Sequence, residues 1–531
     1  MRSSSVLVTA CIAFLAAQVS QATAVELSKA SVARLVVEGS IGAIQKAIFT
    51  RQTSCAAVVQ AYLDRIEAFD KSTGLKAIAI VNPDAARQAE AEDASFRSGI
   101  RPGALFCVPI LVKDNIDTKG FPTSAGSKAL LDNYPGKDAD IVRRIKAAGA
   151  IVLAKTNMAE WAFSPRNSIS SSYGATTNAY DQNRTPAGSS GGTASGIAAS
   201  FGLVGLGSDT GNSVRGPSSF AALVGMRPTL GLVSRDGVVP LQSDRDTAGP
   251  MTRTVEDNAR LLSVIAGQDP GDSMTMKFGQ SKIRDYTAFL KSNALSGARI
   301  GVVRDLAPKD GTDPQVLEAF DAAIKDLKRA GASIIDPIEI PNLKVHLDKG
   351  NFCSRFAFDV NTYLEAEKSP SKVKDVRDVF QAGNYAPDSK FDFQRFLKGS
   401  ENDPTKMTPP CPYYLDHPGR RAFLREVESA MDHAHVDALI YPSWRFPPPL
   451  QENSTRDYRG DNSQLLAPPT GMPAITVPAG YTDGLPVGLQ LLGRRFDEAR
   501  LYALAYGYEQ QTHWRHPPSR FPALSGGSPK P

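Results

Sequence analysis

The stretch TPAGSSGGTASGIAASFGLVGLGSDTGNSVRGPSSFAALVGMR, residues 185–227, decides the fold. Two clusters of small residues, AGSSGGTASG and SDTGNSVRG, flank an apolar run. Glycine permits tight backbone turns and close approach of a ligand to the main chain, and serine supplies a hydroxyl that relays protons or attacks as a nucleophile. Residues 196–201 and 203–206 are typical of a short helix and a buried strand, so we interpret the stretch as a folded element rather than a Gly/Ser linker.

Helical and apolar segments alternate on both sides of this stretch. The patterns predict helices over 25–70, 84–97, 140–148, 313–330 and 498–511, and strands or apolar runs over 76–81, 105–112, 150–154, 298–304, 332–335, 438–441, 474–478 and 487–492. This alternation predicts an α/β fold with helices on both faces of a central sheet. Residues 365–420 break the pattern, being polar and rich in Pro and aromatic residues. We interpret them as an insertion over the substrate side, with a plain surface insertion as the alternative.

Composition narrows the class of protein. The chain has 531 residues, 42% of them hydrophobic, and a net charge of +5 that is scattered rather than arranged in a stripe. These values are ordinary for a globular protein and give no reason to expect a nucleic-acid partner.

The first residues are typical of a secretory signal peptide. Arg2 precedes an apolar run over 6–17, and Ala22-Thr23-Ala24 matches a small-residue cleavage site. The apolar run is too short for a permanent membrane anchor. We therefore expect a signal over residues 1–24, cleavage after Ala24, a periplasmic or secreted protein with one domain over 25–515, and a Pro/Ser-rich tail over 516–531.

Four cysteines would remain after cleavage: Cys55, Cys107, Cys353 and Cys411. They are widely spaced and form no C-x-x-C pair, so they do not predict a zinc site. One or two disulfides and buried free thiols are both compatible with this spacing.

The Gly/Ser stretch is compatible with few kinds of chemistry. Gly188–Gly192 satisfies G-x-S-x-G, but the residues before it are polar and contain Pro186, where a nucleophile elbow needs a strand, and no histidine stands in a setting suited to catalysis. No phosphate-binding loop motif is present. Serine chemistry with a lysine base remains, and Lys113, directly after an apolar run, is the candidate. For a lysine to be half neutral at pH 8, its pKa must fall by about 2.4 units, which corresponds to about 3 kcal/mol. Burial can lower the pKa of a lysine by this much.

The chain resembles the amidase signature family, serine hydrolases with a Ser–cis-Ser–Lys triad. The resemblance covers about residues 50–340 and 436–511. It rests on VPILVKDNID, TPAGSSGGTASG, GLGSDTGNSVRGPS, GMRPTLGLVSRDGVVP, DTAGPMTRTVEDNARLLSVIAG, PPTGMPAITVPAG and GLPVGLQLLGRRFDEA. It implies an α/β/α sandwich around a large central mixed sheet.

Residue by residue, the resemblance makes Ser213 the nucleophile, Ser189 the serine behind a cis peptide bond, and Lys113 the base. The backbone N–H groups of Thr210, Gly211, Asn212 and Ser213 would form the oxyanion hole, with the helix expected from near Pro217 adding its positive end. Ser190, Asp209 and Arg215 would support the loop, the alternative for the last two being an ordinary surface ion pair. The family usually has Gly-Gly-Ser at the nucleophile, so the Asn212 side chain is expected to narrow the space beside Ser213.

The resemblance implies an amidase that hydrolyses a carboxamide C–N bond, with esters and carbamates as further substrates, and from the signal segment we expect it in the periplasm or outside the cell. It implies no metal or cofactor, a small-molecule partner, and a monomer or homodimer. Aromatic residues suggest an apolar or aryl substrate, with a core role as the alternative: Trp161, Phe163, Phe391, Phe393, Phe396, Tyr413 and Tyr414. The alternative functions are an amidotransferase A-type subunit that acts on charged tRNA in a complex, and a non-catalytic binding protein of the same fold.

Overall fold

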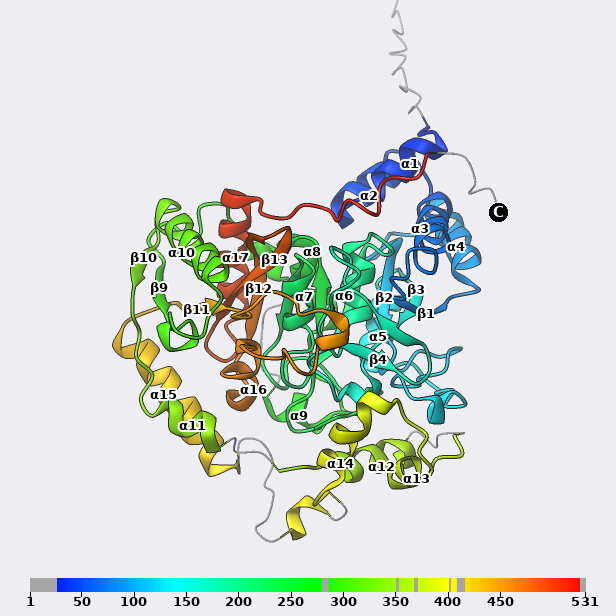
Figure 1. The fold of residues 1–531 in the computed structure, drawn as a ribbon. Helices are drawn as coiled ribbons and strands as arrows, with labels where there is room; N and C mark the ends of the chain where they lie inside the picture. The colour runs from blue at the N-terminus through cyan, green and yellow to red at the C-terminus, as the bar shows by residue number, and fades with distance from the viewer. Residues whose placement is uncertain are drawn as a thin grey trace, which may run out of the picture.

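The computed structural model describes residues 26–278, 285–349, 353–366, 371–400, 403–407 and 416–525. The predicted signal segment, Cys411, Tyr413 and Tyr414 lie outside these residues. Within them, an 11-stranded sheet runs through the molecule in the order β1-β3-β2-β6-β8-β7-β12-β13-β11-β9-β10 (Figure 1). Its strands are β1 (Ile78–Val81), β2 (Val108–Lys113), β3 (Ala150–Thr156), β6 (Val204–Asp209), β7 (Val224–Arg227), β8 (Thr247–Thr252), β9 (Arg299–Val302), β10 (Ser333–Ile335), β11 (Ala438–Pro442), β12 (Ala474–Thr482) and β13 (Leu485–Leu492).

The sheet is mixed. Strand β2 pairs in parallel with β3 and β6, and β9 pairs in parallel with β10 and β11, while the strands between these groups pair antiparallel. The central strands β2, β3 and β6 are buried along their whole length, as expected for strands covered on both faces. A small hairpin of β4 (Ser168–Ser170) and β5 (Gly174–Thr176) lies outside the sheet.

Helices cover both faces of the sheet, as the alternating pattern predicts. Helices α6 and α7 pack on β2, β6, β7, β12 and β13, whereas α5, α8, α10 and α17 contact one another in turn and pack on the sheet as a second group. The helices are α1 (Lys29–Leu35), α2 (Ile41–Phe49), α3 (Cys55–Phe69), α4 (Ala85–Arg97), α5 (Asp140–Ala147), α6 (Gly191–Ala198), α7 (Arg215–Phe220), α8 (Val255–Ile265), α9 (Ser273–Phe278), α10 (Pro314–Arg329), α11 (Leu343–Lys349), α12 (Phe356–Ala366), α13 (Val376–Gln381), α14 (Lys390–Leu397), α15 (Pro418–His433), α16 (Ala467–Thr470) and α17 (Glu498–Thr512). No helix among the described residues combines the length and apolarity needed to cross a membrane.

Local capping explains several helix starts. Ser40 and Ser54 each accept a hydrogen bond from a backbone N–H three residues on, so residues 25–70, which the pattern predicts to be helical with a possible cap at Thr53 or Ser54, form three helices. Helix α7 begins at Arg215, two residues before the expected start at Pro217, because Asp209 accepts the N–H of Val214 just ahead of it.

The N-terminal helices and the C-terminal segment lie together at one end of the molecule (Figure 1). Arg65 of α3 donates to the carbonyl groups of Phe521 and Pro522 at 2.9 and 2.8 Å, and Phe521 is buried. The first part of the predicted tail is therefore packed against α3. A disulfide joins Cys55 at the start of α3 to Cys107 just before β2, with a Cα–Cα distance of 5.5 Å.

Residues 365–420, predicted to lack clear periodicity, form the short helices α13 and α14 within their described parts, and α12 precedes them. Phe356, Phe393 and Phe396 from these helices are buried against Trp161 and Phe163 in a second apolar core, distinct from the core around the sheet. Phe391 is 70% exposed and takes no part in it. The aromatic residues of this region thus build a small core of their own.

Candidate active site

The site lies where two neighbouring parallel strands end. Lys113 is the last residue of β2, and Ser208 and Asp209 are the last residues of β6, which pairs with β2 in register from Ile110 to Val112. Helix α6 begins directly after Ser190 and packs on both strands. Because the carboxyl ends of adjacent parallel strands meet at one edge, the topology brings together residues about 75 to 95 positions apart.

Lys113 is the centre of a buried polar network. Its Nζ lies 2.6 Å from Ser189 Oγ and 2.9 Å from Ser208 Oγ, and its side chain has no exposed surface. Burial lowers the pKa of Lys113 to about 7, against the attraction of Asp209 and Asp246, which raises it. Near neutral pH the amine is thus available as a proton acceptor.

Ser189 is held by the backbone around it. The Gly188–Ser189 peptide bond is cis, which is the arrangement that the resemblance implies. The Ser189 carbonyl accepts the N–H of Ala159 at 3.0 Å. A Cβ at Gly188 would lie 2.2 Å from the carbonyl oxygen of Asn167, so only glycine fits before Ser189. Ser190 Oγ donates to the Ser208 carbonyl at 3.3 Å and so ties the start of α6 to the end of β6.

Ser213 lies in the loop between β6 and α7 and is 5% exposed. Its Oγ donates to Asn212 Oδ1 at 3.4 Å, and no hydrogen bond among the described residues joins it to Ser189. The backbone N–H groups of residues 210–213 likewise donate to no acceptor in the described part of the chain. Four consecutive N–H groups beside a serine hydroxyl can stabilise an oxyanion, provided that they point at the reacting oxygen.

A buried ion network braces this loop. Asp209 pairs with Arg215 at 3.1 Å and with Arg227 at 2.8 Å, and none of these side chains is exposed. Burial alone would raise the pKa of Asp209, but the two guanidinium groups hold it well below its usual range. Arg215 also donates to the Gly211 carbonyl at 2.8 Å. The alternative of an ordinary surface pair is wrong, because both partners are fully buried.

The loop forms one wall of a cavity of about 380 Å³. The cavity is lined by Ala162, Phe163, Pro165, Arg166, Thr210, Gly211, Asn212, Ser213, Leu241, Arg245, Arg395, Phe396, Tyr458 and Gln464. Phe163 and Phe396 therefore belong both to the second core and to the cavity wall, and their contact with an apolar or aryl substrate stays a prediction. Helix α14 supplies two of the lining residues, so the insertion reaches the cavity that holds Ser213.

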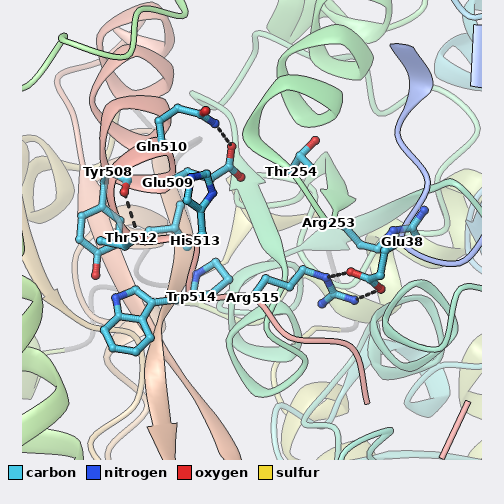
Figure 2. A pocket seen from close by; sticks show the side chains of 12 residues that line it. Glu38, Arg253, Thr254, Tyr508, Glu509, Gln510, Thr512, His513, Trp514 and Arg515 are labelled. Carbon is cyan, nitrogen blue, oxygen red and sulfur yellow. Dashed lines mark hydrogen bonds and ion pairs between the residues drawn. The ribbon is translucent and has the colours of Figure 1, made fainter. Parts of the chain in front are cut away.

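Another cavity, of about 210 Å³, lies between α17, the C-terminal segment and the loop before α2. Figure 2 shows Arg515 and Glu38 side by side in its wall, where the two form an ion pair at 2.6 Å. None of its lining residues belongs to the Lys113–Ser189–Ser213 group. In the described ranges no cluster of three or more His, Cys, Asp or Glu side chains could hold a metal ion.

Three contributors to the site were missed at the level of sequence. Ser208 bonds to Lys113 and also accepts Asn115 Nδ2 at 3.0 Å, and Asp246 accepts the Thr210 hydroxyl at 2.5 Å. Ser208 and Asn115 stand within the motifs GLGSDTG and VKDNID, and their adjacency to Asp209 and Lys113 was the available signal. No sequence motif pointed to Asp246. It comes close to Thr210 only because strand β8 pairs with strand β6 in the folded chain.

Comparisons with known proteins agree with this geometry. The amidase family model matches residues 57–502, and the chain belongs to the amidase signature family. The chain is 36% identical over 467 residues, or 85% of its length and 93% of the relative's, to the A-type subunit of glutamyl-tRNA(Gln) amidotransferase from Exiguobacterium sp..

Solved structures give the same family. The native peptide amidase from Stenotrophomonas maltophilia is 32% identical, with a TM-score of 0.79 over 91% of this chain and 98% of that one. The A-type subunit of glutamyl-tRNA(Gln) amidotransferase from Thermotoga maritima is 26% identical, with a TM-score of 0.68 over 94% and 98% of the two chains. The predicted family and fold class are confirmed.

Proposed function

We propose that the chain cleaves the C–N bond of a carboxamide through an acyl-enzyme on Ser213. The observation that carries the proposal is the fully buried Lys113, whose Nζ lies 2.6 Å from Ser189 Oγ. A lysine with its pKa lowered to about 7 can accept a proton at neutral pH, which an ordinary lysine cannot.

The proton path follows from the contacts. Ser213 turns its hydroxyl from Asn212 to Ser189 when substrate binds, since such hydrogen bonds often tighten only in the complex. Ser213 Oγ attacks the carboxamide carbon while its proton passes to Ser189, and the Ser189 proton passes to Lys113. The C–N bond then breaks, and the proton returns through Ser189 to the leaving nitrogen. Water repeats the sequence on the ester and releases the acid.

The loop supplies the charge stabilisation. The N–H groups of residues 210–213 lie beside Ser213 and have no acceptor among the described residues, so they are free to bind the oxyanion. Losing one such donor typically costs about 3–4 kcal/mol in the transition state. The buried Asp209–Arg215 pair fixes the loop so that this stabilisation needs no rearrangement.

Our first candidate is an amidase that acts alone on small-molecule amides. The likeness to a peptide amidase, with a TM-score of 0.79 against 0.68 for the amidotransferase structure, supports this candidate. The cavity of about 380 Å³ is of a size that takes a small molecule. Export to the periplasm or outside the cell, proposed from residues 1–24, would fit an enzyme without a cytosolic partner.

The second candidate is an amidotransferase A-type subunit, which would pass the released nitrogen to a charged tRNA within a complex. It is favoured by the names of the curated relatives, which are glutamyl-tRNA(Gln) amidotransferase subunits with 33 to 36% identity. It would require partner subunits and would overturn our expectation of no nucleic-acid partner.

The chemistry is tested by labelling the purified mature chain with a fluorophosphonate and mapping the adduct by peptide mass. We expect label on Ser213 that is absent in Ser213→Ala and strongly slowed in Lys113→Ala. Label on Ser190 would support the nucleophile-elbow alternative. A folded protein that takes no label would indicate a non-catalytic binding protein.

The two candidates are separated by testing the chain alone on amides, esters and carbamates, with glutamine and asparagine included. Turnover by the chain alone supports the amidase. Turnover that appears only after co-purification with partner subunits and charged tRNA supports the amidotransferase. Fractionation of cells that make the full-length chain tests export, because a cytosolic, uncleaved protein contradicts it.

A further inference from the structure

We propose that the substrate of this site is an amide whose acyl part carries a carboxylate, held by arginines in the wall of the Ser213 cavity. The inference rests on the proposed function and names its substrate class. Three arginines line the cavity, Arg166, Arg245 and Arg395, and none of its lining residues is Asp or Glu. A cavity with several cations and no acidic wall attracts an anionic ligand.

Arg166 and Arg395 share a single carboxylate. Asp392 forms ion pairs with Arg166 and, at 3.2 Å, with Arg395, and its side chain is only 1% exposed. Two guanidinium groups against one carboxylate leave a surplus positive charge at the cavity wall. Arg166 Nε is buried and has no hydrogen-bond partner among the described residues, so this arginine retains an unused donor.

Arg395 is well placed to supply the surplus charge to a ligand. Its side chain is 55% exposed, whereas that of Arg166 is 14% exposed. Its guanidinium lies over the Phe396 ring at 4.6 Å, which restricts its movement. The guanidinium group presents donors that match a carboxylate in a bidentate arrangement.

Arg245 adds to the same field. Burial lowers the pKa of Arg245 to about 9, and the neighbouring cations Arg420 and Arg227 act in the same direction, against the attraction of Asp244 and Asp246. The flanking Asp244 is paired with Arg420 at 2.6 Å. An anion in the cavity would offset this repulsion, so binding a carboxylate is favoured where binding a cation is not.

The remaining walls define the rest of the substrate. Phe163, Leu241 and Phe396 are apolar, and the 210–213 loop with Ser213 forms the reacting edge. One cavity of about 380 Å³ therefore holds the nucleophile, an apolar surface and a cationic surface. A short acyl chain with the scissile carbonyl at one end and a carboxylate at the other fits this arrangement.

The test uses three p-nitroanilides of similar size that differ in charge. These are the succinyl anilide, its methyl ester, and the 4-aminobutyryl anilide. We expect kcat/KM for the succinyl anilide to exceed that for the methyl ester by about 10-fold or more, because a charge-assisted hydrogen bond to a carboxylate is worth that much. We expect the cationic anilide to be the poorest substrate.

The variant that decides the matter is Arg395→Met. It removes the surplus charge but leaves Arg166 to pair with the buried Asp392, so the fold should be kept. We expect KM for the succinyl anilide to rise about 10-fold with little change in kcat, and the rate on the methyl ester to change less than about 2-fold. Arg395→Lys should recover part of the loss. Arg425→Met, on an exposed arginine of α15 that does not line the cavity, is the matched control.

A second measurement does not depend on turnover of these anilides. Succinamate should protect Ser213 from the fluorophosphonate at lower concentration than succinamide, and Arg395→Met should remove the difference. Equal protection, or equal rates on the charged and neutral anilides, overturns the carboxylate proposal while the proposed function stands. Failure of Ser213 to label or turn over any amide overturns the proposed function, and this inference falls with it.

Discussion

The edge of the sheet that carries Lys113 and the helical insertion α12–α14 are built in different ways. At the sheet edge Lys113 and Ser189 are fully buried and hydrogen-bonded to each other, and the ion pairs of Asp209 with Arg215 and Arg227 have no exposed surface. In the insertion, aromatic rings pack into a separate small core, and charged side chains such as Arg395 reach an open cavity wall.

This difference separates chemistry from selectivity. Residues held on strand ends keep a fixed geometry, which acyl transfer needs. Within its described residues, the insertion lines the cavity through Arg395 and Phe396 and makes no hydrogen bond or ion pair with Lys113 or Ser189, so it can alter the substrate without altering the proton path. Variants at the sheet edge should therefore abolish the reaction, and variants in the insertion should redirect it.

The largest effect is expected from Ser213→Ala. Removing the nucleophile should lower kcat by at least about 10⁴-fold, because the remaining groups can only stabilise attack by water. Amide hydrolysis measured at saturating substrate checks this. Ser98→Ala, at an exposed serine, should keep full activity. Retention of more than a hundredth of the activity in Ser213→Ala would mean that another residue is the nucleophile.

Lys113→Met should follow, with a loss of about 10³-fold in kcat/KM. Methionine keeps the apolar stem of the side chain but removes the base that accepts the Ser189 proton. Lys113→Arg should be equally inactive, since a guanidinium remains protonated. Normal activity in Lys113→Arg would exclude a role for a neutral amine. The melting temperature of each variant shows whether the fold is kept.

Asp209→Asn should destabilise the chain by about 3–5 kcal/mol, which is a factor of about 10² to 10⁴ in the folding equilibrium. It leaves Arg215 and Arg227 buried without their shared carboxylate. Urea denaturation followed by fluorescence measures the change. Asp348→Asn removes one partner of an exposed pair with Lys344 and should cost less than about 1 kcal/mol. If Asp209→Asn and Asp348→Asn lowered the free energy of unfolding by similar amounts, burial would not make the Asp209 carboxylate more important for stability.

The pH profile of kcat/KM should report Lys113. Its pKa is about 7 in the folded chain and only the neutral amine is a base, so the rate should fall about tenfold per pH unit below 7 and level off above it. Burial also raises the pKa of Asp246 to about 6, so Asp246→Asn tests which group sets the limb. If Lys113 sets it, the limb should remain and its midpoint should move below 7, because the attraction of Asp246 raises the pKa of Lys113. A midpoint near 10 would show an unperturbed lysine.

The smallest effect is expected in the insertion. Phe396→Leu reshapes an apolar wall of the cavity, so relative kcat/KM values for aryl and alkyl amides should shift by less than about 10-fold. The rate of fluorophosphonate labelling should change less than about 2-fold, because the Lys113–Ser189 hydrogen bond and the 210–213 loop are unchanged. Phe391 lies on the same helix but is 70% exposed, so Phe391→Leu should change neither the relative kcat/KM values nor the labelling rate. Loss of labelling in Phe396→Leu would show that chemistry depends on the insertion.

Much of the sheet and of the candidate site was predictable from local pattern. The apolar run before Lys113 predicted strand β2, and the alternation of helices and strands predicted an α/β fold, because buried parallel strands are nearly all apolar. Residues 365–420 were harder, since α13 and α14 are short and bury their rings against residues 161–163, far away in the chain. Short helices stabilised by distant contacts carry little periodicity of their own.

The sequence by itself determined which residues are present for the chemistry: Lys113, Ser189 and Ser213 within ordered motifs, and an asparagine at 212 beside the nucleophile. Only the tertiary structure decided the pKa of Lys113, the partners Ser208 and Asp246, the Asn212–Ser213 hydrogen bond and the arginines of the cavity wall. The reason is physical. Motifs specify side-chain types and local turns, whereas desolvation and charge balance depend on which distant elements pack around a group.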